Sequence, residues 1–222
     1  MRRYRRPELA YNQSVICALL LVATVGTYTL TPTDDVWTYP HAYDQTGDPL
    51  LRVWGSGYEA VGVLDESEIT FCMSLLRFDI SKVTEPASKL KKATLVLYNE
   101  MDPGFTREES KADPLQARLV DAEFDEQKWT FYDGEDHMPD GGKDGILGQT
   151  AAVPSVDGKP FRIEIDLLSG KANLRKALTG DAIAFALTTR MAPEGAEGPL
   201  YRIYSRSAEK KYRPQLVLIY EE

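Results

Sequence analysis

The sequence predicts an all-β protein, a jelly-roll-like antiparallel β-sandwich with one short helix behind an N-terminal hydrophobic segment. After Leu30 apolar and polar residues alternate in short segments that are separated by Gly, Pro and Asp. This pattern is typical of β-strands joined by turns. Only one segment has the period of a helix. A length of 222 residues with 43% hydrophobic residues suits a single all-β domain with a sizeable core. Many strands with scarcely any helix indicate a sandwich or jelly roll.

The first thirty residues differ in composition from the rest. Four arginines within residues 1–6 precede an uncharged apolar run, VICALLLVATV, at 15–25. A basic start followed by a short apolar run is typical of a secretory signal. A membrane span needs roughly 18–20 apolar residues, a length reached only by counting on through Leu30. Residues 1–30 are therefore interpreted as a signal peptide or a retained membrane anchor, with a cytosolic hydrophobic tail as the third alternative, and residues 31–222 as the sandwich.

Charge and cysteine content narrow the location and the partners. Cys17 lies inside the apolar run, so a mature domain would hold Cys72 alone and no internal disulfide. We expect a secreted or cell-envelope protein. The net charge of −8 argues against a nucleic-acid binder, which needs a basic face to displace counterions from phosphates. An acidic surface suits neutral or cationic ligands and divalent metals.

Period-2 alternation locates the strands. In the segment 69–80, Cys72, Leu76 and Phe78 fall on one face. Leu75 and Arg77 fall on the other face. Strands are predicted at 35–39, 50–54, 69–80, 93–98, 115–124, 161–167, 182–187, 201–204 and 215–220.

Two segments do not fit the strand pattern. Residues 168–178 (LSGKANLRKAL) place apolar residues at helical spacing, and Gly180 is a suitable residue to end a helix. They predict a short helix or turn that crosses over the sandwich. Residues 133–148, DGEDHMPDGGKDGILG, form a long acidic loop, and loops of this length usually carry function or move.

Six motifs in fixed order carry a family resemblance over the whole predicted domain. The most specific is SLLRFDIS at 74–81, and KATLVLY follows at 92–98. The others are DDV at 34–36 with LLRVWG at 50–55, IDL at 165–167, Gly180 with AIAFAL at 182–187, and Tyr204-Ser205 with RPQLVL at 213–218. In this order the chain resembles the DNRLRE-type β-sandwich family, grouped among carbohydrate-binding modules of family 96. The resemblance implies a module that binds polysaccharide without cleaving it.

The chain departs from this family at two positions. The family carries a glutamate soon after the Ser-Arg of the closing motif, whereas this chain has Ser207 there and Glu209 two residues on. The family's middle segment holds paired tryptophans, whereas only Trp129 stands before the acidic loop.

An enzyme is not expected. His41 and His137 are the only histidines, and no nucleophile motif accompanies either. Glu164-Ile165-Asp166 is similar to the catalytic strand of laminarinase-type glycoside hydrolases, but the second glutamate that such a pair of carboxylates needs is replaced by Leu167-Leu168-Ser169. Asp166 is instead predicted to cap the crossover turn by accepting backbone N–H bonds.

Candidate binding residues are aromatic for a glycan and acidic for a metal. Sugars stack their C–H faces on exposed rings, and Tyr43, Trp129 and Tyr132 stand near predicted turns. A structural Ca²⁺ ion has two candidate locations. One is the acidic loop, and the other is a sandwich edge where Asp34 or Asp35 would meet Glu209 if the terminal strands lie side by side.

Three functions remain open from the sequence. The first is a secreted or surface-attached carbohydrate-binding module whose partner is a polysaccharide. The second is a structural or adhesion module of the cell envelope with no glycan ligand. The third is a degenerate glycan-active enzyme that depends on Asp166.

Overall fold

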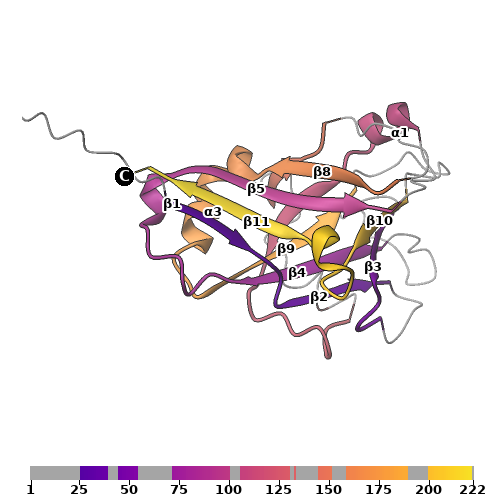
Figure 1. Cartoon of the computed structure of the whole chain (residues 1–222), viewed down its shortest axis with the longest axis horizontal. Helices are drawn as coiled ribbons and strands as arrows, with labels where there is room; N and C mark the ends of the chain where they lie inside the picture. The colour runs from indigo at the N-terminus through magenta and orange to yellow at the C-terminus, as the bar shows by residue number, and fades with distance from the viewer. Residues whose placement is uncertain are drawn as a thin grey trace, which may run out of the picture.

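The protein is an antiparallel β-sandwich, which confirms the predicted fold class (Figure 1). The computed structural model describes residues 26–39, 45–54, 72–100, 106–130, 133, 145–151, 159–189 and 200–221. The described strands form one sheet of six and one sheet of five. In Figure 1 strands of the larger sheet lie in front of strands of the smaller one.

The larger sheet, sheet A, has the order β1-β11-β5-β10-β3, and β8 pairs with the other edge of β5. Its long central strand β5 explains this branching, because β11 pairs with its first part and β10 meets it at Asn99. The strands of sheet A are β1 (Gly26–Leu30), β3 (Leu50–Val53), β5 (Leu90–Asn99), β8 (Phe161–Asp166), β10 (Tyr201–Tyr204) and β11 (Gln215–Tyr220).

The smaller sheet, sheet B, has the order β2-β4-β9-β6-β7. Its centre is the pairing of β4 with β9, where Phe78 packs edge-on against Phe185 with ring centroids 5.8 Å apart. The strands of sheet B are β2 (Asp34–Thr38), β4 (Met73–Asp79), β6 (Gln116–Val120), β7 (Ile146–Gln149) and β9 (Ala182–Thr188).

The main core lies between the two sheets and follows the predicted alternation. Leu76 and Phe78 of β4 point into it and are fully buried, as are Leu95 and Leu97 of β5. Cys72 is a buried free thiol in the same core. Burial of such side chains contributes roughly 1.5–3 kcal/mol each, so this core is the main source of stability.

The outer face of sheet B is covered by the segment that follows β6. Phe124 and Trp129 of this segment pack on each other, with ring centroids 5.3 Å apart, above a second apolar cluster. That cluster contains Leu75, which the sequence placed on the face opposite Leu76. The members of the second cluster are Val36, Met73, Leu75, Val120, Phe124, Ala184 and Ala186.

The sandwich extends beyond the predicted boundary at residue 30, because β1 is part of it. Gly26–Leu30 pairs with β11 along its whole length, and Tyr28 packs edge-on against Tyr220 with ring centroids 6.0 Å apart. Gly26–Leu30 therefore belongs to the sandwich. An anchor that extends through Leu30 would use residues that the sheet already holds, so the apolar run before the domain ends at Val25.

This boundary predicts the effect of a truncation. A chain that begins at residue 31 loses the β1 ladder and the Tyr28 contact, and exposes the edge of β11. We expect it to be about 2 kcal/mol less stable than a chain that begins at residue 26, from the lost apolar burial. Urea unfolding of the two chains measures the difference, and equal midpoints would contradict the role of β1.

The helices and the acidic loop differ in part from the sequence prediction. The predicted crossover at 168–178 is confirmed as η5 (Leu167–Gly170) and α3 (Lys171–Ala177). A further short helix, α1 (Arg107–Ala112), was not predicted. The end of the predicted loop 133–148 belongs to β7, where a Cβ on Gly148 would lie 1.9 Å from the Asp166 carbonyl oxygen. Within the described ranges, no helix has the length and apolar character needed to cross a bilayer.

Candidate functional site

Three tyrosines form a cluster on the outer face of sheet A. Tyr98 comes from β5, Tyr204 from the end of β10, and Tyr212 from the short helix η6 (Lys210–Tyr212). The rings of Tyr204 and Tyr212 are stacked, with centroids 4.9 Å apart and planes 17° apart. The rings of Tyr98 and Tyr212 are 5.7 Å apart. All three side chains are half-buried, so the cluster, hereafter the tyrosine surface, stays open to solvent.

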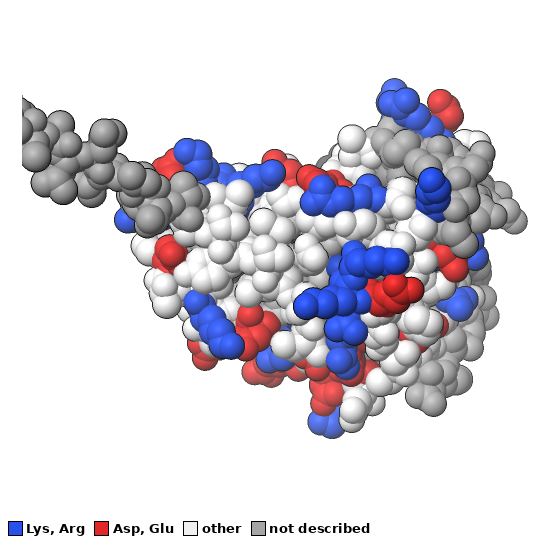
Figure 2. All heavy atoms as spheres, viewed as in Figure 1, with Lys and Arg blue, Asp and Glu red and all other residues white. Residues whose placement is uncertain are grey.

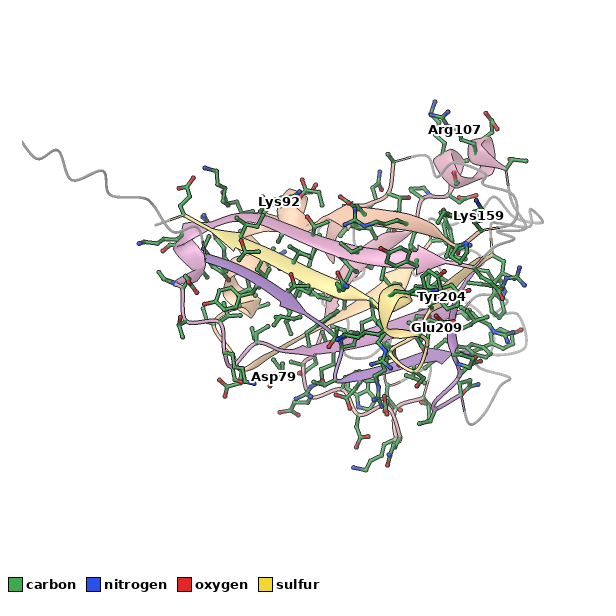
Figure 3. The ribbon with its side chains drawn as sticks, viewed as in Figure 1. Asp79, Lys92, Arg107, Lys159, Tyr204 and Glu209 are labelled. Atoms are coloured by element: carbon green, nitrogen blue, oxygen red, sulfur yellow. The ribbon has the colours of Figure 1, made fainter. Side chains whose placement is uncertain are left out.

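Charged side chains border the tyrosine surface. Arg162 of β8 stands opposite Tyr98 in the strand pairing, and Lys211 lies over the Tyr212 ring at 4.6 Å from its centroid. On the other side Arg202 pairs with Glu100 at 3.0 Å. These groups offer hydrogen-bond donors and acceptors around a flat apolar centre. In Figure 3 Tyr204 and Glu209 lie together, away from Lys92.

The electrostatic surroundings keep the Tyr204 hydroxyl protonated. Burial raises its pKa above the usual 10.0, and the nearby Glu100 carboxylate and Tyr212 hydroxyl raise it further. A protonated phenol can donate a hydrogen bond as well as accept one. Tyr204 therefore presents both functions to a neutral polar ligand at physiological pH.

The segment between β10 and β11 directly follows Tyr204, carries Tyr212, and is fixed by its own hydrogen bonds. The Ser205 N–H donates to the Pro49 carbonyl at 2.9 Å, which ties the segment to the chain before β3. The Arg213 side chain donates to the Ala208 carbonyl at 2.9 Å and closes the turn. The Tyr212 N–H donates to a backbone carbonyl at 2.8 Å. These hydrogen bonds fix the position of the loop that carries Tyr212.

A buried ion cluster anchors the same segment from below. Arg206 donates through its guanidinium to both carboxylate oxygens of Glu126, one of them at 3.1 Å. Its backbone N–H donates to the Asp35 carboxylate at 2.5 Å, and the Asp35 N–H donates to Glu126 at 2.9 Å. Asp35 is 4% exposed and Glu126 8% exposed. This Asp35–Glu126–Arg206 cluster joins β2, the segment after β6 and the segment after β10.

The Asp35 carboxyl group is the titratable centre of this cluster. Burial raises its pKa from 3.8 to about 7, although the Arg206 N–H and guanidinium act in the opposite direction. The neighbouring Glu126 carboxylate adds to the rise. One arginine therefore compensates two buried carboxylates, and one of the two changes charge near neutral pH.

The three acidic residues predicted to bind calcium lie beside basic residues. Asp34 pairs with Arg77 at 3.1 Å, and Asp35 is held by Arg206. Glu209 pairs with Lys211 at 3.1 Å. Among the residues described, no three His, Cys, Asp or Glu side chains are grouped to hold a metal ion. Calcium at these positions stays a prediction. The ion would have to compete with the side chains of Arg77, Arg206 and Lys211.

The aromatic residues predicted for glycan binding are only partly located. Trp129 is half-buried and packs on Phe124 over the outer face of sheet B. Tyr43 and Tyr132 lie outside the described residues, as does most of the acidic loop 133–148. Of these three, the structure describes only Trp129, which lies on sheet B and not at the tyrosine surface.

The sequence did not single out the tyrosine surface or Glu126. A usable signal was present, because Tyr98 and Tyr204 each stand at the outward position of an alternating strand. Tyr212 comes from a segment with no period, and its stacking on Tyr204 is a tertiary contact.

Asp166, at the end of β8, caps the turn that follows the strand. The Asp166 side chain accepts from the Leu168 N–H at 2.9 Å and caps η5, which confirms the predicted cap. Glu164 is exposed and pairs with Arg162 two residues earlier. Both residues lie on the outer face of β8, on the same side of sheet A as Tyr98.

No family model matches the chain, and no curated protein matches it.

Proposed function

We propose that the protein is an exported, non-catalytic carbohydrate-binding module that recognises a polysaccharide on the tyrosine surface. The observation that carries the proposal is the open cluster of Tyr98, Tyr204 and Tyr212 on a rigid sheet. The resemblance to DNRLRE-type modules and the signal-like N-terminal sequence support it.

The chemistry of the tyrosine surface suits a sugar chain. The C–H faces of a pyranose stack on flat apolar rings, and hydroxyls need donors and acceptors at the rim. The three tyrosines supply the flat rings. Arg162, Arg202 and Glu100 supply the hydrogen-bond donors and acceptors at the rim. Rigid aromatic side chains lose little entropy on binding, so such a surface can hold a ligand without closing over it.

The tyrosine surface on sheet A is open to solvent, whereas Phe124 and Trp129 cover the outer face of sheet B. Figure 2 shows a broad strip without charged side chains over β1, β11 and β5, with the basic and acidic residues of the segment after β10 beside it. A long polymer can lie along such an open face. The alternative function, a structural or adhesion module of the envelope, would use this face for protein contacts.

Alanine variants test the tyrosine surface. Tyr98→Ala and Tyr212→Ala are each expected to weaken binding to the recognised polysaccharide about tenfold, because each removes a stacking ring worth on the order of 1–2 kcal/mol. A glycan array identifies the polysaccharide, and isothermal titration measures the affinities of the variants with calcium and with chelator.

Tyr39→Ala is the matched control for these variants. It removes a half-buried tyrosine that packs on Trp54 with ring centroids 5.2 Å apart, on the core side of the sandwich. We expect its affinity to equal that of the unmodified protein. A folded protein that binds no glycan would instead support the envelope module.

A further inference from the structure

One end of the sandwich is basic although the chain as a whole is acidic. This end consists of η3 (Ala87–Lys89), the start of β5, the end of β11 and helix α3. These elements touch, because the Arg175 guanidinium donates to the Ser88 carbonyl at 2.7 Å and the Glu221 N–H donates to the Lys89 carbonyl at 3.0 Å. The basic residues of this end, hereafter the basic end, are Lys89, Lys91, Lys92, Lys171, Arg175 and Lys176.

The acidic residues at the basic end are already engaged. Glu221 pairs with Lys91 at 2.7 Å, and Lys91 and Lys171 lower its pKa. Glu85 accepts a hydrogen bond from the Tyr28 hydroxyl. Four lysines remain exposed and make no ion pair within the described residues, namely Lys89, Lys92, Lys171 and Lys176. With a net charge of −8 for the whole chain, the excess of negative charge must lie elsewhere.

The first described strand, β1, begins at the basic end. Gly26 begins β1 beside Tyr220 of β11, and the ideal Cβ position of Gly26 lies against Glu85. The apolar run of the sequence ends at the residue before it. No spacer therefore separates that run from the basic end, and any bilayer that takes up the run lies next to these lysines.

We infer that the basic end is a docking surface for an anionic phospholipid membrane. Lysines within a Debye length of a negatively charged bilayer, about 8–10 Å at physiological salt, are attracted to it. The apolar run to Val25 is shorter than a full span, so electrostatic attraction would add to a weak insertion, as two-signal membrane anchors do. The tyrosine surface then lies away from the membrane, since Figure 3 separates Lys92 from Tyr204. This inference does not depend on glycan binding.

Sedimentation of the full chain with vesicles tests the inference. The probes are vesicles of phosphatidylcholine alone and vesicles with about a third phosphatidylglycerol. The variant K89Q/K92Q/K171Q/K176Q removes the four exposed lysines. We expect it to bind the anionic vesicles at least about tenfold more weakly than the unmodified chain, with no change on neutral vesicles.

A second variant controls for total charge. R107Q/K111Q/K159Q/K210Q removes four exposed basic residues outside the basic end, and Figure 3 shows Arg107 and Lys159 away from Lys92. We expect it to bind like the unmodified chain. Equal weakening by both variants would overturn the inference, as would an unchanged affinity of the first variant for anionic vesicles. Selective loss of binding to a soluble anionic polysaccharide, with vesicle binding retained, would overturn it in favour of a polymer partner.

Discussion

Arg206→Ala is expected to lower the free energy of unfolding by about 3 kcal/mol at pH 8. The substitution leaves the carboxylates of Asp35 and Glu126 buried without their cation, and breaking one side of a buried ion cluster typically costs about 3–5 kcal/mol. Arg206 is itself partly exposed, which places the expected loss at the lower end of that range. Urea unfolding at pH 8 measures the change from the midpoint and slope.

Two variants separate this effect from a general loss of charge. Arg162→Ala breaks an exposed pair with Glu164 and is expected to change stability by less than about 1 kcal/mol. Arg206→Lys keeps the charge but cannot bind both Glu126 oxygens with one planar group, so its loss should be intermediate. If Arg206→Ala were no more harmful than Arg162→Ala, the cluster would not anchor the segment after β10.

Asp35→Asn is expected to stabilise the protein increasingly as the pH rises. Burial raises the pKa of Asp35 to about 7, so between about pH 4 and pH 7 the folded protein holds a proton that the unfolded chain has lost. The contribution of Asp35 to stability is therefore complete below about pH 4 and is lost as the pH rises through 7. Asparagine stays neutral and avoids this loss.

The measurement is the difference in unfolding free energy between the Asp35→Asn variant and the unmodified protein at several pH values. We expect this difference to shift in favour of the variant by about 2–4 kcal/mol between pH 4.5 and pH 8. Other carboxylates also make stability depend on pH, such as Asp79 and Asp125, whose pKa values are lowered. Their contributions are equal in both proteins and therefore cancel in the difference. Parallel curves would show that Asp35 keeps its ordinary pKa in the fold.

Local periodicity was enough to predict most of the sandwich. β10 and β11 have the predicted bounds, and β4 points Leu76 and Phe78 inward as the alternation requires. β1 was missed because its residues continue the apolar composition of 15–25, and only its pairing with β11 separates it. β7 was missed because it is four residues long and contains Gly148, which local propensity disfavours in a strand.

The candidate site was harder to predict because its contacts join distant residues. Asp35 was correctly marked as a charged residue at a sandwich edge, but its partner Arg206 is 171 residues away in the chain. No local pattern in the sequence pairs Asp35 with Glu126 or with the Arg206 guanidinium. The stacking of Tyr204 on Tyr212 likewise depends on the turn between β10 and β11, whose shape no pattern in the sequence specifies.

NMR titration measures residue by residue whether a polysaccharide binds on the tyrosine surface. Two-dimensional amide spectra are recorded while an oligosaccharide from the polysaccharide identified on the array is added. We expect the largest shifts on Tyr98, Tyr204 and Tyr212 and on their neighbours Arg162 and Arg202. Shifts that gather instead around Trp129 on sheet B, with the tyrosine surface unchanged, would contradict it.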